Sequence, residues 1–225
     1  MKFTPNLTRT EQRSGFIVLA VCMFLLPSLL AVLIPDLSDA RLNFTAYFIS
    51  AAAALYVLRG FLLRNLAAAM AQPFRCLYIG CVGYLAHLAL TELATLVIYM
   101  IAPGFWNLND ANITTLLGAE FGLMALVAVV LAPITEECFF RGLIFRGLYD
   151  RSPVLAWVLS AGLFAAVHVI GYIGLYSPVE LVLAFFQYLP SGVALCIAYQ
   201  RGGSILSPIL THMIVNAMAL WQFLA

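Results

Sequence analysis

The chain has 225 residues, of which 64% are hydrophobic and 9% are charged, and its formal net charge is +1. Soluble domains carry about 25% charged residues, so a soluble globule could not cover this much apolar surface. A disordered chain would need far more charge, and a nucleic-acid binder would show a basic excess. These figures predict a polytopic membrane protein, which contacts the lipid bilayer and does not bind nucleic acid.

Seven apolar stretches are long enough to be transmembrane helices, which need about 20 predominantly apolar residues. In chain order they cover about 16–35, 42–63, 77–102, 116–149, 153–170, 179–199 and 204–224. Their apolar runs are continuous and rich in Ala and Leu, whereas outer-membrane strands alternate apolar and polar residues. We therefore expect an all-α polytopic membrane helix bundle with about seven transmembrane helices, eight being the alternative count, in one membrane-embedded domain over 1–225.

Positive charge is distributed unevenly over the predicted connections. Alternate sides of the membrane receive ten Lys and Arg residues against one, which is Arg41. Connections rich in Lys and Arg stay in the cytoplasm, so we predict a cytoplasmic N-terminus. Arg141 belongs to a motif described below and is left out of the count. The remaining nine Lys and Arg residues against one still favour this orientation. The short chain and short tails favour a bacterial cytoplasmic membrane.

Ionisable side chains inside apolar spans each require an explanation, because a charge near the bilayer centre costs about 2.5–3.5 kcal/mol. Such residues are His87, Glu92, Glu120, Glu136, Glu137, Arg141, His168 and His212. His87 and Glu92 are five residues apart and do not share a helix face well. We interpret these two and Glu120 as interhelical hydrogen-bonding groups, with the lining of a substrate cavity as the alternative.

Two adjacent glutamates lie in the segment APITEECFFRG, residues 132–142. Glu137 and Arg141 are i and i+4, so they share a helix face and can form an ion pair. Glu136 lies about 100° around the helix from Glu137 and cannot share Arg141 as easily. In an apolar environment, Glu136 would be suited to act as a general base. Pro133 is expected to kink this helix or to start a new one, and Thr135 to cap it.

Two further polar pairs occur at helical i, i+4 spacing. Phe164 precedes His168, which places an aromatic ring beside an imidazole. His212 and Asn216 share a face and can both donate hydrogen bonds to one point, as an oxyanion requires. If the fourth and fifth spans turn near 150–153, Glu136 lies about 20 Å and His168 about 22 Å along their helices from that turn, so the two residues have similar depth. His212 lies about 12 Å from the start of its own span, so its depth matches theirs less well.

These three patterns occur in a fixed order: Glu-Glu-x-x-x-Arg at 136–141, Phe-x-x-x-His at 164–168 and His-x-x-x-Asn at 212–216. They resemble the CPBP family, also known as the Abi family or type II CAAX prenyl endopeptidases, which are intramembrane proteases. The resemblance covers about 116–225, the catalytic core helices, and leaves 1–115 without a family motif. It implies that Glu136 activates water, that His168 holds and polarises this water, and that His212 and Asn216 stabilise the oxyanion. Glu137 and Arg141 are then the supporting pair.

The resemblance implies a glutamic-type protease without a cofactor. The alternative is a zinc-dependent protease, because the family was long described as metalloproteases and Glu136, His168 and His212 could form a His₂Glu set. No His-Glu-x-x-His motif occurs. The expected substrate is a membrane-anchored or transmembrane peptide or protein, with a prenylated CAAX tail as one class.

Two other functional classes stay open. One is a non-catalytic bacteriocin-immunity or regulatory membrane protein, which would keep the fold without the chemistry. The other is a small ion-coupled transporter that uses the buried ionisable groups as a path. The absence of obvious inverted repeats argues against the transporter.

Overall fold

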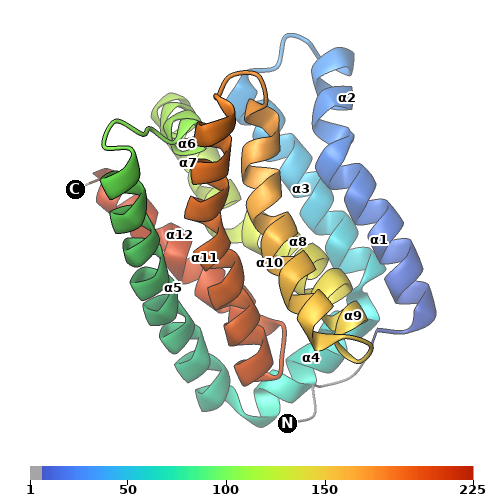
Figure 1. The fold of residues 1–225 in the computed structure, drawn as a ribbon. Coiled ribbons are helices and arrows are strands. Elements are labelled where there is room, and N and C mark those ends of the chain that lie inside the picture. Colours follow the sequence, from blue (N-terminus) through green and yellow to red (C-terminus); the bar gives the residue numbers. More distant parts are fainter. Residues whose placement is uncertain (1–6, 225) are drawn as a thin grey trace.

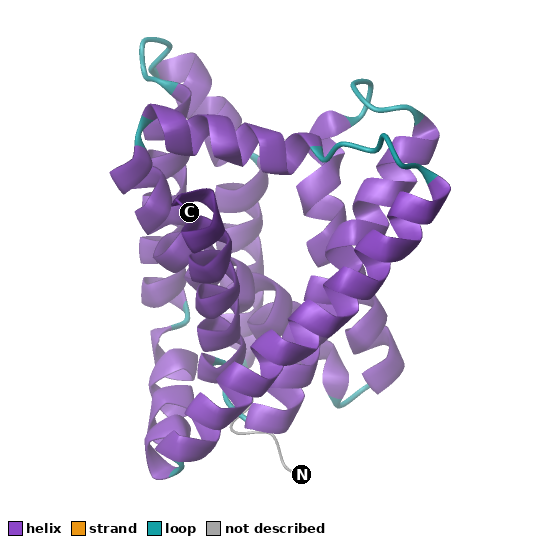
Figure 2. Cartoon of the chain, turned by 90° about the vertical axis from the view of Figure 1, so that its left-hand side faces the viewer, coloured by secondary structure: helices purple, strands orange, loops and turns teal. Residues whose placement is uncertain are grey.

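Helices account for almost all of residues 7–224, the part of the chain that the computed structural model describes, and these residues form no β-strand (Figures 1 and 2). The helices are α1 (Arg9–Phe24), α2 (Leu26–Leu33), α3 (Asp39–Val57), α4 (Arg59–Ala71), α5 (Pro73–Ile101), α6 (Leu108–Ala119), α7 (Phe121–Leu126), η1 (Val127–Leu131), α8 (Ala132–Glu137), η2 (Cys138–Arg146), α9 (Gly147–Tyr149), α10 (Pro153–Val169), η3 (Ile170–Tyr172), α11 (Pro178–Gly202) and α12 (Leu206–Leu224). Both η1 and η2 are π-helical, and η3 is a single 3₁₀ turn. The predicted all-α class is confirmed.

Four helical stretches among residues 7–224 are long and apolar enough to cross a membrane. They are Pro73–Ile101, Phe121–Tyr149, Pro153–Tyr172 and Pro178–Gly202. The number rises to six if two bent pairs each form one span: α1 with α2, bent by 48°, and α3 with α4, bent by 79°. The expected count of about seven is therefore not confirmed. The seventh predicted stretch does form α12, but its polar residues Thr211, His212 and Asn216 lower its hydropathy.

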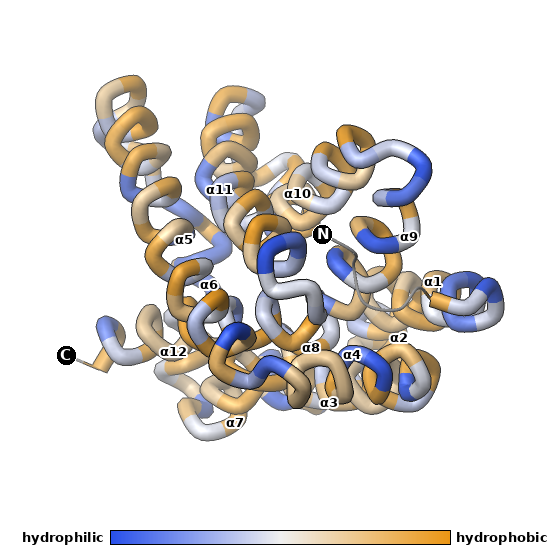
Figure 3. The backbone as a smooth tube through the Cα atoms, turned by 90° about the horizontal axis from the view of Figure 1, so that it is seen from below, coloured by the Kyte–Doolittle hydropathy of each residue, from blue (hydrophilic) through white to orange (hydrophobic). Residues whose placement is uncertain are grey.

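The outer surface of the bundle is apolar, as expected for helices that face lipid. Large hydrophobic side chains such as Val32, Phe74 and Val154 are at least 75% exposed. Viewed along the bundle, hydrophobic residues predominate along the helices (Figure 3). Such a continuous apolar surface would be unfavourable in water and is stable in a bilayer.

One end of the bundle gathers eight arginines, and we call it the arginine-rich end. They are Arg9, Arg13, Arg59, Arg64, Arg75, Arg146, Arg151 and Arg201. Contacts between distant connections define this end: the Arg64 guanidinium pairs with Glu11 at 2.6 Å, and Arg75 donates a 2.7 Å hydrogen bond to the Arg201 carbonyl. Lys2, which also counted toward the predicted orientation, lies outside the described residues.

The opposite end is covered by α6 and the loops around it, and we call it the α6 end (Figure 1). Arg41 lies here and pairs with Glu120 at 3.0 Å. The Tyr176 hydroxyl accepts a hydrogen bond from the Leu108 amide and donates one to the Trp106 carbonyl, so α6 is held against the loop between α10 and α11. The two ends of the molecule therefore differ in their number of arginines, as predicted for the connections.

The segment with the paired glutamates differs in detail from expectation. Pro133 is the second residue of α8, which follows the π-helical η1, and the span Phe121–Tyr149 continues through it. Thr135 does not cap a helix, because helical backbone precedes it and its hydroxyl donates to the Leu131 carbonyl at 2.9 Å. The expected cap is therefore wrong. All nine residues of η2 are buried, so this irregular segment forms the centre of the bundle.

Candidate active site

The ion pair between Glu137 and Arg141 forms the buried base of the site. Both side chains are fully buried, and Arg141 Nη1 lies 2.9 Å from Glu137 Oε1, which confirms the predicted i, i+4 pair. The same Glu137 oxygen lies 2.9 Å from His212 Nδ1. Arg141 Nη2 donates to the Gly192 carbonyl at 3.0 Å, and its guanidinium lies 4.5 Å from the centre of the Phe164 ring. This network connects the core of the bundle to α10, α11 and α12.

Glu136 points away from that ion pair, as its position on the helix predicts. Its side chain is buried, and its Oε1 accepts a 3.0 Å hydrogen bond from the Tyr47 hydroxyl on α3. Its Oε2 is buried and has no hydrogen-bond partner within residues 7–224. A buried carboxylate oxygen without a partner is costly unless a water or a substrate group donates to it. Glu136 therefore has one oxygen fixed by the protein and one oxygen available for chemistry.

His168 presents an acceptor nitrogen to the same region. Its Nδ1 lies 2.7 Å from the Phe164 carbonyl, which can only accept, so Nδ1 carries the proton. Nε2 is then an acceptor in the neutral ring. The imidazole contacts the Phe164 ring at 4.7 Å, as predicted, and stacks on the Tyr188 ring at 4.5 Å. Backbone and aromatic contacts together fix the tautomer and the plane of His168.

One cavity of about 460 Å³ brings the three motifs together. Glu136, His168, His212 and Asn216 all line it. A neighbouring cavity of about 380 Å³ is also lined by Glu136 and His168, and Tyr47 lines both cavities. Side chains from three predicted spans, far apart in sequence, thus line one shared cavity.

The two expected oxyanion donors are engaged with different acceptors in this structure. His212 Nδ1 contacts Glu137, and Asn216 Nδ2 donates to the Ala128 carbonyl at 2.7 Å. The amide of Asn216 carries a second hydrogen that can still point into the cavity. His212 can donate through Nε2 only as an imidazolium, because Nδ1 already donates to Glu137.

Residues of α6 and the preceding loop form a polar cover over His168. The Tyr188 hydroxyl donates a 2.5 Å hydrogen bond to Asp110 and accepts one from the Asn109 amide at 2.9 Å. Desolvation by the surrounding protein raises the pKa of the partly exposed Asp110 carboxyl. The stacked Tyr188 ring thus connects this cover to the imidazole.

Sequence reasoning missed Tyr47, Tyr188 and Asp110, which lie outside the three motifs. A tyrosine hydroxyl inside an apolar span needs a hydrogen-bond partner, and this was the available signal. The other ionisable residues lie elsewhere: neither cavity that contains Glu136 is lined by His87, Glu92 or Glu120. Glu120 pairs instead with Arg41, in agreement with the predicted hydrogen-bonding role.

The donor set for a metal does not assemble here. Across residues 7–224, no group of three His, Cys, Asp or Glu side chains is arranged to hold an ion. Within the described residues, the zinc set of Glu136, His168 and His212 therefore does not assemble.

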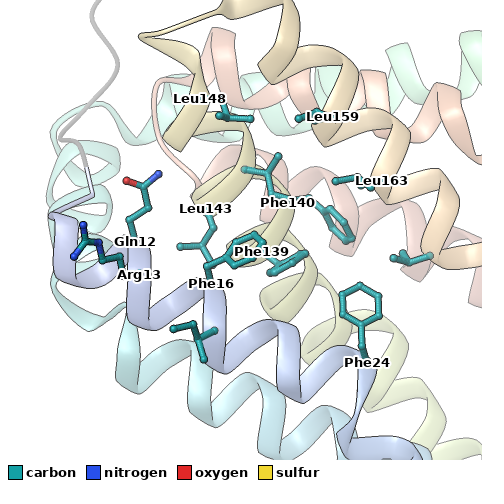
Figure 4. A pocket seen from close by; sticks show the side chains of 13 residues that line it. Gln12, Arg13, Phe16, Phe24, Phe139, Phe140, Leu143, Leu148, Leu159 and Leu163 are labelled. Carbon is teal, nitrogen blue, oxygen red and sulfur yellow. The ribbon is translucent and has the colours of Figure 1, made fainter.

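An apolar cavity of about 700 Å³ adjoins the site (Figure 4). Aromatic and leucine side chains of α1, η2 and α10 line most of it, and Gln12 and Arg13 are its polar lining residues. Phe24 and Val167 line both this cavity and the 380 Å³ cavity that contains Glu136. Its described lining includes no acidic residue or histidine, so it offers space for a hydrocarbon group and no catalytic chemistry.

The apolar helices and the polar site define the class: an integral, multi-pass membrane protein with a hydrolase-like cluster of Glu and His residues at its centre. Residues 118–218 match the family described as "Type II CAAX prenyl endopeptidase Rce1-like". This match contains all three motifs. The match over these residues supports the resemblance to the CPBP family of CAAX proteases that the motifs predicted.

Two curated relatives are similar to part of the chain. The UPF0177 protein YbdI of Lactococcus lactis subsp. lactis (strain IL1403) is 32% identical over 95 residues, which is 42% of this chain and 46% of the relative. An uncharacterized 24.3 kDa protein of Escherichia coli is 30% identical over 101 residues, 44% of this chain and 43% of the relative. The chain thus spans less than half the length of either relative. No solved structure matches.

Proposed function

We propose that this protein is an intramembrane endopeptidase that hydrolyses a peptide bond of a membrane-associated substrate with water activated by Glu136. One observation carries the proposal. Glu136 Oε2 is buried without a partner within residues 7–224, and Glu136 and His168 line the same cavity. The family match makes proteolysis the expected reaction class.

The two acceptors fit the two hydrogens of one water molecule. A water that donates one hydrogen to Glu136 Oε2 and the other to His168 Nε2 directs a lone pair away from both. Attack on the carbonyl carbon forms the new C–O bond while Glu136 takes a proton from the water. When the C–N bond breaks, Glu136 returns this proton to the leaving amine. No covalent acyl-enzyme forms in this sequence.

The charge that develops on the carbonyl oxygen requires donors inside a dry cavity. We assign this role to the second amide hydrogen of Asn216 and to Nε2 of His212 in its imidazolium form. Glu137 supports that form by accepting from Nδ1, and Arg141 fixes Glu137. These roles follow the family motif and are consistent with the hydrogen bonds described above.

The proposed catalytic type is glutamic and metal-free, and the proposed location is a bacterial cytoplasmic membrane. The apolar cavity beside the site suits a substrate that carries or adjoins hydrocarbon, which both a prenylated CAAX tail and a transmembrane peptide do. The substrate is therefore proposed as a class and not as a single molecule.

The test compares purified variants in liposomes with a panel of fluorogenic transmembrane and lipidated peptides. Glu136→Gln removes the base with almost no change in volume, and we expect cleavage to cease while folding is preserved. Glu120→Gln is the matched control, because Glu120 lies at the α6 end outside both cavities of Glu136. Equal cleavage by Glu136→Gln and wild type would contradict the proposal and favour the immunity or regulatory function. An ion flux in the same liposomes would favour a transporter.

A further inference from the structure

A cavity of about 270 Å³ lies at the α6 end, between the last turns of α5, the loop that follows it and α11. Three aromatic residues line this cavity: Tyr99, Phe105 and Trp106. Asp110 is the charged residue of its described lining. Tyr99 is 63% exposed and Trp106 is 69% exposed, so a ligand can reach their rings. We call this volume the aromatic cavity.

Contacts with neighbouring elements hold the walls of the aromatic cavity in place. The Trp106 carbonyl accepts a 2.6 Å hydrogen bond from the Tyr176 hydroxyl, and the Phe105 ring stacks on the Tyr176 ring at 6.0 Å. Asn107 Nδ2 donates to Gln187 Oε1 at 2.7 Å, which ties the loop to α11. The cavity is therefore built by the fold, and a ligand would spend little binding energy on ordering it.

The Asp110 carboxylate has no arginine partner within residues 7–224. Its Oδ1 accepts the Tyr188 hydroxyl, and the one arginine of the α6 end, Arg41, pairs with Glu120 instead. Aromatic residues at the end of a span are typical of a membrane interface, but this tendency does not account for a carboxylate among them. A carboxylate beside aromatic rings suits an ammonium group, because it offers an opposite charge and the ring faces attract cations.

Asp110 also joins the aromatic cavity to the candidate active site. It lines both the aromatic cavity and the 460 Å³ cavity that contains Glu136. The tyrosine that donates to it, Tyr188, carries the ring that stacks on His168. One peptide can therefore place its scissile bond beside Glu136 and a nearby ammonium group beside Asp110. This shared wall favours a group of the substrate over the headgroup of a lipid, which has no need to approach Glu136.

We propose that the aromatic cavity is a subsite for a positively charged group of the substrate, the ammonium of a lysine side chain or of a free amino terminus near the scissile bond. This inference rests on the proposed protease function and adds a chemical requirement to its substrate. The ammonium group lies against the Asp110 carboxylate and the ring faces of Tyr99 and Trp106.

Binding of a small amine tests the cavity without any need for cleavage. The probe is n-butylammonium, and 1-butanol is its uncharged counterpart. Trp106 fluorescence reports binding in a background that carries Trp157→Phe and Trp221→Phe, since the chain has three tryptophans. We expect saturable quenching by the amine and none by the alcohol, with an affinity that falls about tenfold in Asp110→Asn.

Asp39→Asn is the matched control for amine binding, because Asp39 is exposed and lines neither the aromatic cavity nor the 460 Å³ cavity. This variant should bind the amine like its parent. No saturable quenching, quenching by both compounds alike, or equal affinity in Asp110→Asn would overturn the inference.

Cleavage of matched peptides tests the substrate requirement in liposomes. Peptides with a lysine near the scissile bond are compared with versions that carry norleucine in its place, and peptides with a free amino terminus are compared with acetylated versions. These two arms separate the two sources of the ammonium group. We expect loss of the charge in one arm to lower kcat/KM about tenfold in wild type. The effect should be smaller in Trp106→Leu and absent in Asp110→Asn.

Thermal unfolding in detergent shows whether each variant folds, and Trp106→Leu carries the test if Asp110→Asn does not. Equal kcat/KM for charged and uncharged peptides in both arms would overturn the inference while supporting the protease. Absence of cleavage of every peptide would instead count against the proposed function, and amine binding would still decide whether the aromatic cavity takes an ammonium group.

Discussion

Tyr47→Phe isolates the hydrogen bond that fixes the proposed general base. The substitution removes only the hydroxyl that donates to Glu136 Oε1 at 3.0 Å and leaves the ring in place. Hydrogen bonds to charged groups contribute about 1.5–3 kcal/mol. If that energy serves to orient Oε2 toward the water, kcat falls between about 10- and 150-fold, since 1.36 kcal/mol corresponds to tenfold. Tyr47 positions Glu136 and is assigned no contact with the substrate, so KM should change little.

The assay is cleavage of a reconstituted peptide substrate, with the thermal unfolding of each variant measured in detergent. Tyr78→Phe is the matched control, because the Tyr78 side chain is exposed on α5. In a Glu136→Gln background, Tyr47→Phe should cost less stability than in wild type, because no buried carboxylate is left without a donor. An unchanged kcat, or a loss of activity that matches the loss of folded protein, would refute the positioning role of Tyr47.

The remaining predictions concern the support of the site, the cover and the metal. Arg141→Met leaves Glu137 buried without its ion-pair partner and should lower the free energy of unfolding, measured by denaturant titration, by about 3–5 kcal/mol. Adding Glu137→Gln should recover part of this loss. No recovery would show that Arg141 acts by packing alone. The pKa of Asp110 is raised in the folded protein, so stability should be greatest at low pH and fall as the pH rises through that pKa. Asp110→Asn should abolish this fall in thermal scans between about pH 4 and pH 8, and an identical fall in the variant would assign it to another group. A zinc chelator such as 1,10-phenanthroline should leave the cleavage rate unchanged, whereas a loss of rate that zinc restores would favour the metal-dependent alternative.

Local spacing predicted the parts of the site that depend on a single helix. Glu137 with Arg141 and Phe164 with His168 are four residues apart, and helix geometry alone brings each pair together. The similar depth of Glu136 and His168 followed from counting along two helices that share a turn. Both residues do line one cavity, because α10 returns alongside η2 from the turn near 150–153.

Features that depend on packing between distant helices could not be read from the sequence. The depth of His212 counted along its span matched that of the glutamates less well, yet its Nδ1 contacts Glu137 because α12 packs against α8. The contact of Tyr47 with Glu136 depends on how α3 rotates, and no motif reports that rotation. The bend between α1 and α2 was also missed, although Pro27 near the start of α2 is a common cause of a break.

The central claim is that Glu136 activates water for peptide hydrolysis, and profiling of N-terminal peptides tests it most directly. Membrane vesicles from cells that contain wild type or Glu136→Gln at matched abundance are compared, with Glu120→Gln as the control. New N-termini of membrane peptides should appear with wild type and Glu120→Gln and be absent with Glu136→Gln. Identical sets of N-termini in all three samples, with each protein folded and inserted, would contradict the claim.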